Sequence, residues 1–197
     1  MLGEMDAFRQ STSTVTNSDG LAGLEVSRAF IQCAREFLKN DYLPKIERCL
    51  EQLTDEQVWW RANPESNSIG NLLLHLCGNA RQWIVSGLGS EPDRRVRQRE
   101  FDERTMIARS ELLSRLRETL DEVDTVLANF DGERILDQHR IQESAVIALE
   151  AIFHVIEHFS MHTGQIILLT KMLTKEDLTF YDFSTGGPLQ TWHEPQR

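Results

Sequence analysis

The stretch His154-Val155-Ile156-Glu157-His158-Phe159-Ser160-Met161-His162-Thr163-Gly164-Gln165-Ile166 repeats a metal-capable side chain every four residues. It lies within a longer segment, Ala145 to Leu173, that has no proline, a single glycine and apolar residues at helical spacing. We therefore predict a long buried helix there, apolar on more than one side. Residues four apart stack on one face of a helix. His154, His158 and His162 thus form a ladder whose neighbours can share one ion.

A lone histidine on an apolar helix is usually a hydrogen-bonded core residue. Three at this spacing favour a metal, because packed imidazoles cannot all carry a proton cheaply. Two sites can be drawn. His154-x-x-Glu157-His158 matches the inverted zincin pattern of a protease. Such a protease needs a further acidic ligand on a later helix, whereas the acidic residues after His162 all lie in a short polar tail. The other site pairs His158 with His162 and takes a third ligand from another helix, for which His75 is a candidate.

Two segments together resemble the DinB superfamily of helical bundles, which includes proteins regarded as metal-dependent thiol transferases. They are Leu72-Leu73-Leu74-His75-Leu76 and His158-Phe159-Ser160-Met161-His162-Thr163-Gly164-Gln165-Ile166. The similarity continues through residues 53–61 and 177–181, and is greatest to a subfamily without an established function. In that family a histidine of the second helix and an HxxxH pair of the fourth bind a divalent metal. The resemblance therefore implies His75, His158 and His162 as ligands, with His154 outside the site, and a homodimer.

The rest of the chain is consistent with an all-α, DinB-like four-helix bundle. Predicted helices cover residues 21–53, with an interruption or kink at Pro44, then 67 or 68 to about 86, 107–130 and 145–173. The polar connection 87–105 is too long for a tight hairpin, so helices two and three are expected to run parallel, joined by a crossover. The organisation we expect is a disordered tail at 1–20, the bundle at 21–174, and a C-terminal arm at 175–197 that packs on the bundle or on a partner subunit.

Several side chains near the expected ligands are candidates for supporting the site. Asn71 and Asn79 fall one turn either side of His75 and could accept its second ring N–H or hold a water. Trp83 extends the same face and could close the site with an apolar wall. His154 stays a pocket candidate, as does Glu157, which points about 100° away from His158 on a helix.

Composition restricts the class of protein. The chain has 197 residues and a formal net charge of -10, which disfavours binding to nucleic acid. Its one basic cluster, residues 94–99, is followed at once by acidic residues, and we interpret it as a solvated connection. No run reaches the roughly 18 to 20 apolar residues of a membrane span, and the N-terminus does not resemble a signal peptide, so a cytoplasmic protein is expected. Cys33, Cys49 and Cys77 are interpreted as reduced core thiols.

The functional hypothesis is a metal-dependent enzyme, a thiol transferase or a hydrolase, in which one divalent transition metal activates water or a thiol. Zinc or nickel suits an imidazole set best, and iron or manganese is compatible with it. A small-molecule substrate or thiol is the expected partner. The alternatives are a non-catalytic bundle that binds a metal or small ligand and the inverted-zincin protease.

Overall fold

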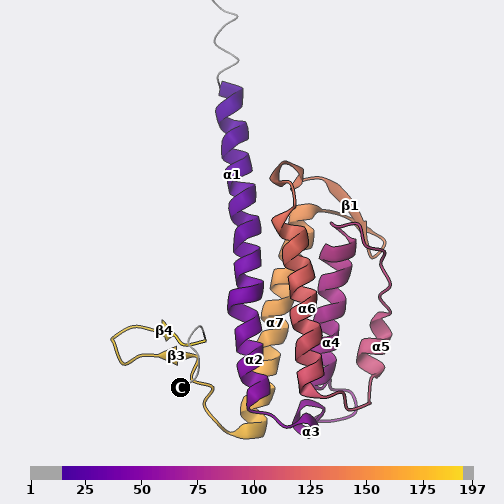
Figure 1. Ribbon diagram of the computed structural model, residues 1–197, viewed down its shortest axis with the longest axis vertical. Coiled ribbons are helices and arrows are strands. Elements are labelled where there is room, and N and C mark those ends of the chain that lie inside the picture. The colour runs from indigo at the N-terminus through magenta and orange to yellow at the C-terminus, as the bar shows by residue number, and fades with distance from the viewer. Residues whose placement is uncertain (1–14, 193–197) are drawn as a thin grey trace, which may run out of the picture.

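Helices dominate the computed structural model, which describes residues 15–192, with side chains from residue 20 onward. The helices are α1 (Val15–Glu36), α2 (Leu43–Glu51), α3 (Asp55–Val58), α4 (Ile69–Ala80), α5 (Arg97–Asp102), α6 (Arg109–Ala128) and α7 (Ala148–Thr174). Two short antiparallel hairpins accompany them, made of β1 (Gln138–Ile141) with β2 (Ser144–Ile147) and of β3 (Tyr181–Asp182) with β4 (Leu189–Gln190). The predicted all-α bundle is confirmed, built from the α1–α2 rod, α4, α6 and α7 (Figure 1).

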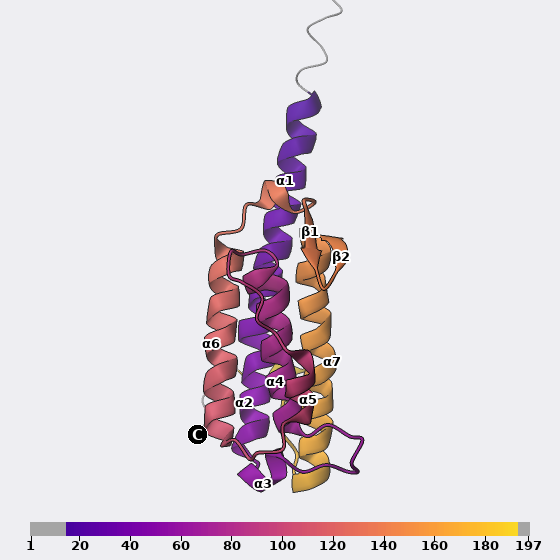
Figure 2. The same cartoon turned by 90° about the vertical axis from the view of Figure 1, so that its right-hand side faces the viewer.

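The connection between α4 and α6 is a crossover, as predicted. Arg81, just after α4, pairs with Glu122 near the end of α6 at 2.8 Å. At the other end, the Trp59 indole before α4 donates to the Ile107 carbonyl before α6 at 2.8 Å. The two helices therefore run parallel. The connection that follows α4 in the sequence runs back along the outer side of that helix and forms α5 there, before α6 begins (Figure 2).

Pro44 interrupts the regular hydrogen-bond pattern of the first rod without breaking it. The segment Phe37–Tyr42 is π-helical, and Pro44 stands in the first turn of α2. Proline has no N–H to donate to the carbonyl four residues earlier, which here belongs to Asn40. That carbonyl accepts a hydrogen bond from the Trp192 indole at 3.2 Å. The predicted interruption is thus a π-helical segment that also receives the C-terminal arm.

The C-terminal arm, the segment after α7, is attached to α2 by the buried guanidinium group of Arg48. Arg48 donates to the carbonyls of Thr179 at 3.1 Å and of Thr191 at 2.7 Å. Leu178 and Trp192 are buried, while the β3–β4 hairpin between them projects from the bundle (Figure 1). Arg48 and the two buried side chains thus fasten this segment to α2.

The first and last helices of the bundle begin at other residues than the sequence predicts. The first helix begins at Val15, so the tail predicted over residues 1–20 is too long; residues 1–14 and 193–197 lie outside the described part of the chain. The last helix begins at Ala148, because residues 138–147 form a hairpin. Its two-residue turn, Gln142 and Glu143, has the positive φ values of 51° and 65° that such turns need. His139 is half-buried on β1.

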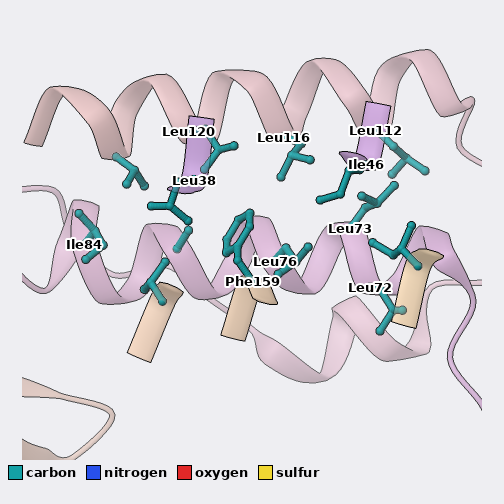
Figure 3. Close-up of a cluster of buried hydrophobic side chains, with 14 of the residues drawn as sticks. Leu38, Ile46, Leu72, Leu73, Leu76, Ile84, Leu112, Leu116, Leu120 and Phe159 are labelled. Carbon is teal, nitrogen blue, oxygen red and sulfur yellow. The ribbon is translucent and has the colours of Figure 1, made fainter. Parts of the chain in front are cut away.

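The core lies where α4, α6 and α7 face the rod. Leu73 and Leu76 of α4, Leu116 of α6 and Phe159 of α7 are all fully buried there (Figure 3). Phe159 stacks on Tyr42 with ring centroids 6.4 Å apart. α7 thus has Phe159 against the core, one residue after His158. Within residues 15–192, no helix combines the length and hydropathy needed to cross a membrane.

Replacing Phe159 with alanine should test this packing. We expect the free energy of unfolding to fall by about 3–5 kcal/mol, because a fully buried ring leaves a cavity. The matched control is Phe183→Ala in the β3–β4 hairpin, where the ring is 67% exposed and the change should stay within about 0.5 kcal/mol. Urea unfolding followed by circular dichroism measures both. Equal losses in the two variants would contradict the packing described.

Candidate metal centre

Three imidazoles meet between α4 and α7. His75 of α4 and His158 and His162 of α7 are all buried. The Nε2 atom of His158 lies 3.0 Å from Nε2 of His75 and 3.2 Å from Nε2 of His162. An ion bound at 2.0–2.1 Å from each nitrogen sets the nitrogens about 2.9 to 3.4 Å apart in octahedral or tetrahedral geometry. The spacing therefore suits one divalent transition metal, and this cluster could hold one.

The outer ring nitrogens indicate which tautomers are present. Nδ1 of His75 lies 2.7 Å from a carboxylate oxygen of Glu100, and Nδ1 of His162 lies 2.7 Å from the side-chain oxygen of Gln165. Both contacts require a proton on Nδ1, since the partner oxygens only accept. Nε2 of each ring then has its lone pair free and directed at the neighbouring rings. Two of the three imidazoles are thus held in the form that binds a metal.

His158, the central ring, is held neutral by its surroundings. Burial and the neighbouring rings of His162 and His75 lower its pKa to about 3. Burial likewise lowers the pKa of His162, against the opposing effect of its bond with Gln165. A metal needs neutral imidazoles as ligands. The central His158 ring therefore stays neutral well below neutral pH.

The crossover connection supplies a buried ion pair that the sequence-based interpretation missed. Arg95 donates from Nε to Glu100 at 2.7 Å, and the two side chains are only 5% and 10% exposed. Although burial raises the pKa of the Glu100 carboxyl, hydrogen bonds from His75 and Arg95 outweigh it and leave the pKa below its ordinary value. Phe101 covers the His75 ring at 4.7 Å between centroids. The prediction of a solvated connection is therefore wrong for Arg95 and Glu100.

The asparagines expected to support His75 have other partners. Asn71 donates to the backbone carbonyl of Glu100 at 2.7 Å and accepts from the Ser68 side chain at 2.6 Å, so its hydrogen bonds fasten α5 to α4 and do not go to the His75 ring. Asn79 donates to Nε2 of His154 at 3.0 Å. Nδ1 of His75 is instead hydrogen-bonded to Glu100, which is 25 residues away in the sequence.

The remaining candidates lie beside the three-histidine cluster. Trp83 packs on His154 with centroids 4.0 Å apart, so it covers that ring and not the three nitrogens. His154 is half-buried, 5.5 Å from the His158 ring, and outside the metal-capable group. Glu157 is exposed, in line with its expected direction on the helix. The geometry groups His158 with His162 and His75, and leaves out His154, the other histidine of the zincin pattern.

The cysteines lie apart from the centre. Cys77, two residues after His75, is turned toward Thr119 of α6, and burial raises its pKa to about 11. Burial also raises the pKa of Cys49 to about 11. Cys33 is exposed, so its interpretation as a core thiol is wrong. Within the described residues, the metal-capable group contains imidazoles alone.

Chelator-treated protein should lose stability as the pH falls from 7.5 to 5.5. His154, His158 and His162 have pKa values lowered by burial, so the unfolded chain binds more protons than the folded one below about pH 6.5, and stability falls with pH there. Urea unfolding in the presence of a chelator measures the slope. It should be shallower in His158→Leu, which removes the most strongly shifted ring, and an unchanged slope would contradict the burial described.

Comparisons with known proteins give the family and the fold. A model described as "Protein of unknown function (DUF1572)" matches residues 25–186, and none of the curated proteins matches the chain. A conserved protein from Enterococcus faecalis shares the fold at a TM-score of 0.55 and 15% identity, with 77% of this chain and 97% of that one covered. A DinB-like protein from Bacillus cereus gives a TM-score of 0.53 at 17% identity, with coverage of 70% and 91%. The chain therefore belongs to the DUF1572 family and has a DinB-like fold.

Proposed function

We propose that the chain binds one divalent transition metal through Nε2 of His75, His158 and His162, and that it is a metal-dependent enzyme, a thiol transferase or a hydrolase. The observation that carries the proposal is the convergence of three buried ring nitrogens at 3.0 and 3.2 Å. Two of the three are in the tautomer that turns a lone pair inward. Three protein ligands leave at least one position open, which is the mark of a catalytic site.

The protein's own residues prepare this site in two ways. Glu100 and Gln165 hold the outer nitrogens of two rings, and Phe101 shields His75 from water. When bound, a divalent metal lowers the pKa of a water or thiol that it coordinates, and so supplies a nucleophile near neutral pH. Zinc or nickel suits an all-imidazole donor set best, and iron or manganese is compatible with it. Because the metal would activate a thiol or a water, the expected substrate is a low-molecular-weight thiol or a small molecule that can be hydrolysed.

A second candidate function is a non-catalytic bundle stabilised by its metal. One observation favours it. A cavity of about 1290 Å³ is lined by Glu100 and Arg95 but by none of the three histidines. A bound substrate would therefore need access to the metal by another route. Turnover assays with thiols and esters separate the two functions, since the binding module predicts metal-dependent stability without any reaction.

Elemental analysis of protein purified without added metal or chelator tests the site. Wild type should hold about one equivalent of a transition metal, because three imidazoles form one centre. His75→Ala and His162→Ala should lose it, whereas His154→Ala, the matched control on the same helix, should keep it. Metal that depends on His154 but not on His75 would contradict the three-histidine site and favour the protease pattern. Absence of metal in wild type, even after reconstitution, would also contradict it.

We further propose that two copies of the chain pair through the outer face of α7. Large apolar side chains are at least 36% exposed along almost its whole length, at Leu149, Phe153, Met161, Leu168 and Met172. A stripe of this kind on one helix is self-complementary about a two-fold axis, and water contact along it is unfavourable.

Light scattering coupled to size-exclusion chromatography tests this pairing. Wild type should have twice the mass of one chain, and the double variant Phe153→Glu with Leu168→Glu should have the mass of one, because charges cannot be buried unpaired. Met106→Glu is the control, since Met106 is 53% exposed in the connection before α6. A monomeric wild type at tens of micromolar, or a dimeric double variant, would contradict the proposal.

A further inference from the structure

Glu100 is fixed at both its backbone and its side chain. Its backbone carbonyl accepts from Nδ2 of Asn71 at 2.7 Å, which ties α5 to the start of α4. Its carboxylate accepts from Arg95, with Nε 2.7 Å from Oε1 and Nη2 3.0 Å from Oε2. Arg95 is held in turn by Gln82 at 2.8 Å. A buried carboxylate with this many partners has one orientation.

That orientation directs Oε2 of Glu100 at Nδ1 of His75, 2.7 Å away. Nη2 of Arg95 lies 3.1 Å from the same nitrogen, so two tautomers have to be compared. If Nδ1 accepted from Arg95, its lone pair would face a carboxylate oxygen at 2.7 Å, and the two would repel. If Nδ1 carries the proton, it donates to the carboxylate in a charge-assisted hydrogen bond. The second arrangement leaves Nε2 of His75 unprotonated and facing His158.

Gly78 makes room for this contact. It lies one turn after His75 on α4, beneath the Arg95–Glu100 pair. A Cβ atom there would overlap Oε1 of Glu100, lie 2.8 Å from its Cδ and 3.0 Å from Nε of Arg95. Glycine destabilises the interior of a helix relative to alanine. Its presence inside α4 is accounted for by the close approach of the carboxylate.

We propose that Glu100 is a positioning residue for the metal site, which fixes the tautomer and ring orientation of His75 from the crossover connection. The proposal rests on the proposed function. It assigns α5 a role beyond linking two helices, since it brings the outer partner of one ligand. Groups that orient metal-binding histidines typically contribute about 10- to 100-fold to metal affinity. A purely structural pair would instead contribute to folding alone.

Two variants separate the roles. Glu100→Gln keeps the size of the side chain and removes its charge, and Gly78→Ala displaces the carboxylate without touching a ligand. Glu122→Gln is the control, since Glu122 pairs with Arg81 at the surface of the neighbouring helix. Zinc affinity is measured by competition with a chromophoric chelator. The His75 tautomer is measured by ¹⁵N NMR on metal-free protein, with the His75 signals assigned from His75→Ala.

Wild-type His75 should be protonated at Nδ1, and Glu100→Gln and Gly78→Ala should mix the two tautomers and weaken zinc binding by about 10- to 100-fold. Glu122→Gln should match wild type. Zinc affinity within twofold of wild type in both variants, with the tautomer unchanged, would overturn the inference. A wild type that binds no zinc would contradict the proposed function only, because the tautomer of metal-free His75 still decides whether Glu100 positions it. If Glu100→Gln does not fold, Gly78→Ala alone decides.

Discussion

His158 lies within hydrogen-bond distance of both His75 and His162 in the interior of the bundle, and protonating it is costly because its charge would be buried and would face the neighbouring rings. Its pKa accordingly falls to about 3. Neutral rings turn the lone pairs of their nitrogens toward one another. A cation bound between them replaces the repulsion of these lone pairs with attraction. The surrounding structure follows from this constraint. α7 presents two of the rings four residues apart, and α4 presents the third at the same height.

The crossover topology contributes to the same centre. Because α4 and α6 run parallel, the connection after α4 has to travel back along the bundle before α6 begins, and it does so over the outer side of α4 (Figure 2). There Glu100 contacts His75. The return path carries Arg95, Glu100 and Phe101, which hold and cover one ring. A tight hairpin between antiparallel helices would not bring such groups to the site. The topology of the bundle and the chemistry of its centre are therefore linked.

Local sequence patterns predicted the fold well. The absence of proline and the apolar spacing gave the long last helix to within three residues of its start, and Ser68 is the cap that opens α4. The histidine ladder, together with the family resemblance, identified the three rings that meet. The partners of those rings were harder to predict. Gln165 is one turn from His162 and was within reach of helical geometry, whereas Glu100 is 25 residues from His75, in a stretch whose alternating charges resemble a solvated loop. Asn71 and Asn79 were placed on the correct helix, but long-range contacts decided their partners.

The most direct test of this account is an anomalous difference map from a crystal of the protein grown or soaked with zinc. One strong peak is expected about 2.0–2.1 Å from Nε2 of each of the three rings, His75, His158 and His162. Nδ1 of His75 should remain hydrogen-bonded to Glu100. A peak held by His154 with His158, or a crystal that takes up zinc only at surface carboxylates, would contradict the three-histidine centre.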